Sequence, residues 1–209
     1  MTTTPTTLAL FDLDGTLLPH DSDHAFGEHL IALGWVDERA HREANDHFYR
    51  QYQAGCLDVD AYVDFATAPW RARSEAEQRD ALASFMRERI EPHLHEVARE
   101  LVRMHQRAGD TVAIVTATNE FVTAPIAAAL GVDTLIATRL ERDAQGRVTG
   151  RIAGTPSFRE GKIARVDDWL ATLGRRWTDY AHTVFYSDST NDLPLLERAS
   201  EPVATNPSP

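Results

Sequence analysis

The sequence has little of what holds small secreted proteins together or carries a chain across a membrane. Its 209 residues include a single cysteine, Cys56, which excludes an internal disulfide and any cysteine-based metal cluster. No apolar stretch approaches the roughly 18 residues that suggest a membrane span. The start, Met1 to Thr7, lacks the basic residues of a signal peptide. We therefore expect a cytoplasmic protein.

Basic residues are also scarce, since 21 Lys and Arg stand against 32 Asp and Glu and give a formal net charge of −11. This charge argues against nucleic acid and anionic membranes as partners, because both favour basic surfaces. Apolar side chains, by contrast, are plentiful. They make up 43% of the chain, which is ample for the buried core of one domain or of a core with a small insertion. The composition leaves the oligomeric state unknown.

The later part of the chain alternates short apolar runs with helical patterns. Strands are expected at Thr7–Phe11, Thr111–Val115, Thr134–Ala137, His182–Tyr186 and Pro202–Ala204. Helices are expected at His95–Arg107, Glu120–Leu130, Glu160–Leu173 and Asp192–Arg198. A polar turn at Asp143–Gly146 predicts a hairpin between Thr138–Glu141 and Arg147–Ile152. The alternation predicts an α/β fold with a doubly wound, Rossmann-like parallel sheet, whose ligands collect beyond the carboxyl ends of the strands.

The stretch from Ser22 to Ile90 shows helical patterns and no convincing strand. The expected helices are His24–Leu33, Glu38–Gln53, Val59–Phe65 and Glu75–Arg89. Gly34, Gly55 and Pro69 are interpreted as the breaks between them. We therefore expect an all-helical cap domain, residues 20–90, inserted into an α/β core of residues 1–19 and 91–209. Because the insertion leaves the core beside the first acidic motif, it would exclude water from the site and inspect the substrate.

Two carboxylates stand one residue apart where the first apolar run ends, in Phe11-Asp12-Leu13-Asp14-Gly15-Thr16. Acids two apart on a strand project from the same face, so both ionise comfortably only with a cation or strong donors between them. We interpret Asp12 and Asp14 as a metal-bound site for an anionic substrate. The alternative is a purely structural role in a turn, for which Asp and Gly are ordinary residues.

Two further segments offer groups that bind phosphate. The run Thr116-Ala117-Thr118-Asn119 ends a strand and opens a helix, so the Thr116 hydroxyl and the following backbone N–H groups can hold phosphate oxygens. One of Thr118 and Asn119 is also expected to be the helix N-cap. Lys162 follows a glycine at the start of another helix, from which it can neutralise phosphate charge and pair with Asp12.

The last segment, Ser187-Asp188-Ser189-Thr190-Asn191-Asp192, again carries acids at the end of an apolar strand. Mg²⁺ prefers oxygen ligands and keeps several waters. One carboxylate here, together with Asp12 and a backbone carbonyl, would therefore suffice to bind it. The structural alternative is a capping role for Ser189 or Asn191 with exposed acids.

Taken in this order, the four motifs resemble those of the haloacid dehalogenase (HAD)-like hydrolase superfamily, and the resemblance spans essentially the whole chain. The helical insertion is similar to the C1-type cap of the phosphoserine phosphatase-like branch, subfamily IB, which also contains histidinol-phosphate phosphatases. The family commonly continues beyond the point where this chain ends, at Pro207-Ser208-Pro209, so the sequence leaves open whether that end is native.

The resemblance implies a Mg²⁺-dependent phosphatase that acts on a small phosphorylated metabolite. Asp12 would attack phosphorus to form an aspartyl-phosphate, and Asp14 would act as general acid and base. The other implied roles are metal binding by Asp12, the Asp14 backbone carbonyl and Asp188, support of the metal by Asp192, and phosphate binding by Thr116, Ala117 and Lys162. The second aspartate and the Mg²⁺-type acids favour phosphatase chemistry over dehalogenation.

The choice of substrate depends on residues near the cap. Asp21 lies nine residues after Asp12, the spacing of an acid with which phosphoserine phosphatases grip the amino group of their substrate. Ala117, however, replaces their glycine, and neither Arg71 nor Arg73 could be assigned to a serine carboxylate. The run Thr116-Ala117-Thr118-Asn119, with His20-Asp21-Ser22-Asp23-His24 before the cap, is more similar to the histidinol-phosphate phosphatases. The resemblance therefore implies L-histidinol phosphate as substrate, with phosphoserine as the alternative.

Other hypotheses stay open. The same chemistry would serve a phosphotransferase that passes the phosphoryl group to a second substrate, and the fold alone is compatible with a non-catalytic binding module. His20, Asp21, Asp23 and His24 could form a zinc site, although polar residues before a helix are more often caps. Trp70 could line the substrate pocket or pack between cap helices.

Overall fold

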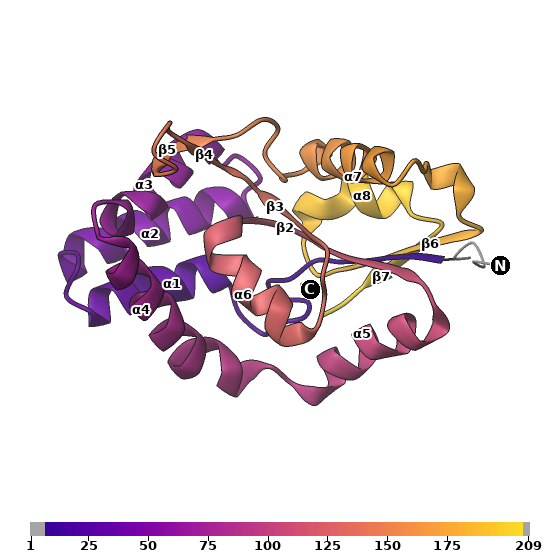
Figure 1. Cartoon of the computed structure of the whole chain (residues 1–209), viewed down its shortest axis with the longest axis horizontal. Coiled ribbons are helices and arrows are strands. Elements are labelled where there is room, and N and C mark those ends of the chain that lie inside the picture. Colours follow the sequence, from indigo (N-terminus) through magenta and orange to yellow (C-terminus); the bar gives the residue numbers. More distant parts are fainter. Residues whose placement is uncertain (1–6, 207–209) are drawn as a thin grey trace.

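A parallel five-stranded sheet runs through the computed structural model, which describes residues 7–206 (Figure 1). Its strand order is β3-β2-β1-β6-β7. The strands are β1 (Thr7–Phe11), β2 (Thr111–Asn119), β3 (Leu135–Thr138), β6 (His182–Ser187) and β7 (Glu201–Ala204). All neighbours pair in parallel, with β1 between β2 and β6. The predicted doubly wound α/β core is confirmed; residues 1–6 and 207–209, including the Pro207–Pro209 end, lie outside the described residues.

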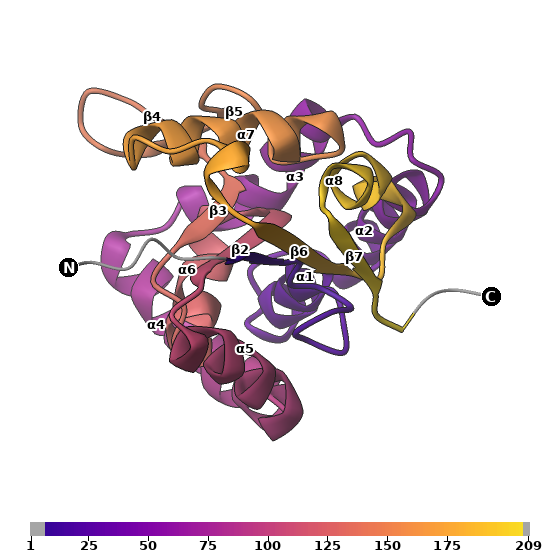
Figure 2. The same ribbon diagram turned by 90° about the vertical axis from the view of Figure 1, so that its right-hand side faces the viewer.

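Helices cover both faces of this sheet (Figure 2). On one face lie α5 (Glu96–Ala108) and α6 (Glu120–Leu130), and on the other α7 (Glu160–Thr172) and α8 (Leu193–Arg198). Short 3₁₀ turns span Trp177–Asp179 and Thr190–Asp192. Successive strand residues face opposite layers, so Ala9 and Phe11 join one buried cluster while Leu8 and Leu10 join the other. This two-sided burial explains why the strands are continuous apolar runs.

Four helices gather beyond the carboxyl ends of β1, β2 and β6 (Figure 1). They are α1 (Ser22–Ala32), α2 (Glu38–Gln53), α3 (Val59–Arg71) and α4 (Glu75–Phe85). A π-helical turn, Met86–Ile90, and a 3₁₀ turn, Glu91–His93, lead back to α5. Each helix begins at a side chain that accepts a backbone N–H bond, namely Asp21, Asp37, Asp58 and Ser74. Within residues 7–206, none of the helices combines the length and the apolar character that spanning a membrane requires.

The interpretation of Pro69 as a helix break is wrong, because α3 continues through it to Arg71. Proline lacks the N–H that would bond one turn back, but near the end of a helix only one such bond is lost. Trp70, directly after it, is 1% exposed and its ring stacks on Phe121 with centroids 4.0 Å apart. Burial of this large side chain therefore holds the last turn in helical form.

The predicted hairpin is present as β4 (Leu140–Arg142) and β5 (Val148–Ile152), which pair antiparallel. It lies against α3, where Arg71 Nη1 donates to the carbonyl oxygen of Thr149 at 2.8 Å. Gly150 makes this approach possible, because a Cβ atom there would lie 1.2 Å from Nη1. The hairpin thus ties the α/β core to the helical segment.

Candidate active site

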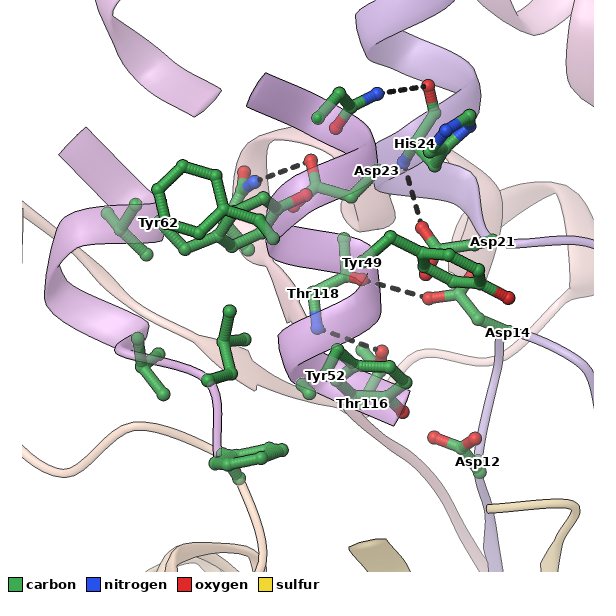
Figure 3. A pocket seen from close by; sticks show the side chains of 18 residues that line it. Asp12, Asp14, Asp21, Asp23, His24, Tyr49, Tyr52, Tyr62, Thr116 and Thr118 are labelled. Atoms are coloured by element: carbon green, nitrogen blue, oxygen red, sulfur yellow. Dashed lines mark hydrogen bonds between the residues drawn. The ribbon is translucent and has the colours of Figure 1, made fainter. Parts of the chain in front are cut away.

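The first two predicted motifs, at the carboxyl ends of β1 and β2, line one pocket (Figure 3). Lys162, Asp188 and Asp192 are not among its lining residues and lie behind or beside the first motif. Asp12 follows β1 directly and is 3% exposed. β2 is longer than expected, so that Thr116 stands inside it and not after it. β6 ends at Ser187, immediately before Asp188.

A buried ion-pair cluster lies behind Asp12. Lys162, in the first turn of α7, places its Nζ 2.9 Å from Asp12 Oδ1 and 2.7 and 2.8 Å from the two carboxylate oxygens of Asp192. Ser187 Oγ donates to Asp192 Oδ2 at 2.7 Å. The predicted pairing of Lys162 with Asp12 is therefore seen, and Lys162 donates one hydrogen bond to each of the two carboxylates.

Burial and neighbouring charges shift the pKa values of this cluster in opposite directions. Burial by itself lowers the pKa of Lys162, but the adjacent carboxylates of Asp12 and Asp192 outweigh it and raise that pKa above its usual value. Burial raises the pKa of Asp12, and the Lys162 ammonium opposes the rise. One ammonium group is thus shared by two carboxylates, so Lys162 only partly neutralises the charge of Asp12.

Asp14 has a set of donors of its own. Because β1 ends at Phe11, the expectation that the two acids project from one face of a strand does not hold. Asp14 Oδ1 accepts the Ser22 N–H at 2.8 Å, and Oδ2 accepts the Thr118 hydroxyl at 2.9 Å. Burial, and secondarily the charge of Asp21, raises the pKa of Asp14 to about 7. A carboxyl group with this pKa can both donate and accept a proton near neutral pH.

The end of β2 lines the pocket with residues that the sequence predicted to bind phosphate. Thr116 is 1% exposed, and its Oγ1 accepts the Thr118 N–H at 3.2 Å. Both Thr116 and Ala117 line the pocket. Asn119 Oδ1 accepts the N–H groups of the first turn of α6 at 3.1 and 3.3 Å, so Asn119 is the N-cap. The capping role that the sequence left open between two residues therefore belongs to Asn119.

Asp188 lies against the backbone of the first motif. Its Oδ1 accepts the Thr16 hydroxyl at 3.1 Å. A Cβ atom on Gly15, whose φ is +75°, would lie 2.2 Å from Asp188 Oδ2, so only glycine allows this approach. Asp192 turns instead toward Lys162, and any support that it gives to a metal would pass through that lysine.

These groups suit a magnesium ion better than a softer metal. Asp188 is held against the Gly15 backbone, in the motif that contains Asp12, and both acids offer the oxygen ligands that Mg²⁺ prefers. Within residues 7–206, no group of three or more His, Cys, Asp or Glu side chains is arranged to hold a metal. A magnesium ion here would therefore depend on two carboxylates, a backbone carbonyl and water, as Mg²⁺ sites commonly do.

The pocket in front of these residues is acidic and aromatic. It encloses about 680 Å³ of space free of atoms, its open mouth included. Asp12, Asp14, Asp21 and Asp23 supply its acids, and rings are supplied by Phe48, Tyr49, Tyr52, Tyr62 and Phe158. No lysine or arginine is among the lining residues of the described chain, and His24 is the one basic side chain there.

Asp21 and Asp23 enter the pocket from the start of α1. Asp21 is the N-cap, with its Oδ1 accepting the His24 N–H at 2.8 Å. Asp23 is 7% exposed, and its Oδ1 accepts the Nδ2 of Asn119 at 3.2 Å. Burial, and secondarily Asp21, raises the pKa of Asp23 to about 7. Sequence reasoning assigned Asp23 no role of its own beyond the zinc alternative, because an acid in the first turn of a helix is ordinary.

The four side chains considered for zinc do not converge. The His20 ring packs edge-on against His93, with centroids 5.0 Å apart. His24 lines the pocket, but its Nε2 faces Asp46 Oδ1 at 3.3 Å. Within residues 7–206 no three such side chains are grouped to hold a metal, so the zinc alternative is not supported.

The cap residues considered for substrate binding lie elsewhere. Trp70 packs on Phe121, which resolves its alternatives in favour of packing. Arg71 is engaged with the hairpin at Thr149. The guanidinium of Arg73 lies over the Trp35 ring, 4.7 Å from its centroid. Neither arginine lines the pocket.

Comparison with known proteins agrees with this geometry. Residues 9–197 match the family described as haloacid dehalogenase-like hydrolase. A histidinol-phosphatase of Neisseria meningitidis serogroup C (strain 8013) is 48% identical over 200 residues, which cover 96% of this chain and 90% of that protein. The crystal structure of a protein of unknown function from Bordetella pertussis Tohama I aligns with a TM-score of 0.91 and 49% identity, covering 99% of this chain and 92% of that one. A substrate-bound phosphoserine phosphatase shares the fold, with a TM-score of 0.68, 18% identity, and coverage of 98% and 88%.

Proposed function

Because the chain belongs to the haloacid dehalogenase-like hydrolase family and is a phosphatase, we propose that it hydrolyses a small amine-bearing phosphate monoester, L-histidinol phosphate. The observation that carries the choice of substrate is the charge of the pocket. Its acids Asp14, Asp21 and Asp23 face a space into which no lysine or arginine of the described chain projects. The similarity to a histidinol-phosphatase supports the same choice.

The two candidate substrates differ in the charges that they bring to this pocket. Phosphoserine carries a carboxylate, which would meet the three acids without a basic partner and be repelled. Histidinol phosphate carries an ammonium group and an imidazole, and no carboxylate. We assign the ammonium to Asp21, whose Oδ1 is held by the His24 N–H at the mouth of α1. An ion pair of this kind is strong only where water is excluded, as it is in a capped pocket.

The proposed reaction proceeds through Asp12. One of its carboxylate oxygens attacks phosphorus, forming an aspartyl-phosphate as the bond to the ester oxygen breaks. Lys162 holds Oδ1 at 2.9 Å, which orients the carboxylate for attack. Asp14 donates its proton to the departing alkoxide, and its pKa of about 7 suits this role. It then takes a proton from the water that attacks the aspartyl-phosphate and releases inorganic phosphate.

The phosphate group would be held by the end of β2, through the Thr116 hydroxyl and the backbone N–H of Ala117. Asp12, the Asp14 backbone carbonyl and Asp188 would hold Mg²⁺, with Asp192 supporting them through Lys162. When bound, the ion neutralises phosphate charge, which otherwise repels an anionic nucleophile.

We further propose that residues 20–90 act as a cap over a core of residues 1–19 and 91–209. Contacts between the end of α2 and the core loops support this division. Asn191 Nδ2 donates to the Tyr52 carbonyl at 2.8 Å, and Arg159 Nη1 donates to the Gly55 carbonyl at 2.9 Å. The Tyr52 hydroxyl also lies 3.4 Å from Ser189 Oγ. Among the described residues, these three polar contacts would have to break for the cap to open at the end of α2.

A phosphate-release assay tests the proposed function. The purified protein is offered histidinol phosphate, phosphoserine and several sugar phosphates, each with Mg²⁺ and with EDTA. We expect Mg²⁺-dependent release, with the highest kcat/KM on histidinol phosphate and none from an Asp12→Asn variant. Release without any added acceptor excludes an obligate phosphotransferase, and turnover excludes a binding module. Higher kcat/KM on phosphoserine would overturn the choice of substrate.

A further inference from the structure

Asp23 is a buried acid of the pocket to which the proposed mechanism gives no part. Figure 3 shows it at the opposite end of the pocket from Asp12. The reacting phosphorus must lie at Asp12, so Asp23 faces the part of the substrate that is farthest from the chemistry. A side chain in this place does not act on the phosphoryl group, but it can select the molecule that carries it.

The position of Asp23 is fixed by the core. Asn119 Nδ2 donates to its Oδ1 at 3.2 Å, and the same Asn119 caps α6 through Oδ1. Thus one residue joins the phosphate-binding strand to the acid of α1. Asp23 is held rigidly, which is what a specificity contact requires.

Rings and apolar side chains surround this end of the pocket. Phe48 and Tyr62 meet edge to face, with centroids 5.3 Å apart, and both line the pocket together with Val63. Tyr62 also bonds through its hydroxyl to the Asp23 carboxyl group. Asp23, Phe48 and Tyr62 thus give this end of the pocket an aromatic surface with an acid beside it. Such a surface suits a flat ring that carries N–H donors.

A structural role alone does not account for an acid at position 23. An asparagine would accept the same Asn119 bond without bringing a charge into a buried site. Lys162 already serves Asp12 and Asp192, and His24 Nε2 faces Asp46, so the described pocket offers no cation to Asp23. The missing donor must then come from what enters the pocket.

We propose that Asp23, flanked by Phe48 and Tyr62, determines specificity by accepting hydrogen bonds from the ring N–H groups of a heteroaromatic substrate. This inference rests on the proposed function and deepens it, because it assigns each of three groups of the substrate to one aspartate. The phosphoryl group lies at Asp12, the ammonium at Asp21 and the imidazole at Asp23. Phosphate esters that lack an N–H ring leave the Asp23 carboxylate without a partner and are rejected.

The test compares two substrates in two variants. Asp23→Asn keeps the acceptor for Asn119 and removes the charge. Asp60→Asn removes one charge from an exposed position in the first turn of α3 and is the matched control. For each protein, kcat/KM is measured with histidinol phosphate and with p-nitrophenyl phosphate, whose ring has no N–H group. We expect the ratio of the two values to fall about 10- to 100-fold in Asp23→Asn, the range for a hydrogen bond to a charged group, and to stay unchanged in Asp60→Asn.

A binding measurement accompanies the kinetics. L-Histidinol and ethanolamine are used as inhibitors of p-nitrophenyl phosphate hydrolysis, and Asp23→Asn should weaken inhibition by histidinol and not by ethanolamine. Tyr62→Phe, which removes one donor to Asp23 and keeps the ring, is the second variant if Asp23→Asn does not fold. An unchanged ratio, whether both activities fall together or neither falls, would overturn the assignment of Asp23 while leaving the proposed function intact. A wild-type protein that releases no phosphate from histidinol phosphate refutes both.

Discussion

Replacing Asp23 by asparagine should stabilise the folded protein at alkaline pH, in spite of the loss of a substrate contact. Burial raises the pKa of this carboxyl group to about 7 in the folded chain, against about 3.9 for an aspartate in an unfolded chain. Below pH 4 the proton is bound in both the folded and the unfolded state, and Asp23 has no effect on the free energy of unfolding. Between these two pKa values the unfolded chain ionises while the folded chain retains its proton. The free energy of unfolding therefore falls as pH rises, and levels off above about pH 7.

The size of the effect follows from the shift. One pKa unit corresponds to about 1.4 kcal/mol. From pH 5 to pH 8, Asp23 should therefore cost the wild-type protein roughly 2 to 3 kcal/mol, because the interval below its folded pKa spans about two units. The neighbouring Asp14 and Asp21 titrate with it, which spreads the change over a wider pH range. Asparagine at this position carries no charge and preserves the acceptor for Asn119.

The assay is urea unfolding followed by far-ultraviolet circular dichroism, at pH 5 and pH 8 and in EDTA to exclude metal. The free energy of unfolding of Asp23→Asn, less that of the wild type, should be larger at pH 8 by roughly 2 to 3 kcal/mol. Asp60→Asn, an exposed control, should differ from the wild type by at most about 0.5 kcal/mol at either pH. The same difference for Asp23→Asn at both pH values would refute the view that Asp23 is buried without a counter-ion.

Three more predictions concern the rest of the site and its support. Lys162→Met leaves two buried carboxylates without a cation, so the free energy of unfolding at pH 8 should fall by about 3 to 5 kcal/mol and phosphate release should stop. A variant that keeps its stability and its activity would contradict the ion-pair cluster. Gly15→Ala places a Cβ atom 2.2 Å from Asp188 Oδ2 and should raise the Mg²⁺ concentration for half-maximal phosphate release about tenfold or more; an unchanged Mg²⁺ dependence would separate Asp188 from the metal. Gly150→Ala meets Arg71 Nη1 at 1.2 Å at a φ of +91° and should lower thermal stability by about 1 to 3 kcal/mol. If its melting temperature matches the wild type, the hairpin is not tied to α3 as described.

The core could be predicted from the sequence because its strands are buried on both faces and therefore read as unbroken apolar runs. β2 shows the limit of this signal. Its second half, Thr116 to Asn119, is mostly polar, so the prediction from apolar residues ended the strand too early, at Val115. Pairing of Asn119 with Thr138 of β3 extends it, and such pairing is a tertiary effect that the local pattern does not contain.

The helices of residues 20–90 were predicted less completely for a similar reason. Pro69 signals a break on local grounds, yet packing of Trp70 on Phe121 of α6 keeps α3 helical. The sequence allowed Arg71 to bind a substrate carboxylate. In the fold its guanidinium instead lies against Gly150 of the hairpin, a contact that the local sequence does not indicate. Asp23 lies in the first turn of α1, where an acid is favoured in any helix, so its position in the pocket depends on how α1 meets Asn119.

The two acids of the first motif show how one residue of separation can divide two chemical roles. The turn after β1, in which the Leu17 and Leu18 N–H groups both donate to the Leu13 carbonyl at 2.9 Å, directs the two side chains to different partners. Asp12 meets a buried ammonium, which favours its charged form, whereas Asp14 meets a backbone N–H and a hydroxyl, which are neutral. Neutral donors do not offset burial beside Asp21, so the pKa of Asp14 rises to about 7. Burial raises the pKa of both acids, but only Asp12 has a cation beside it that opposes the rise, whereas Asp14 can hold the proton that a general acid needs.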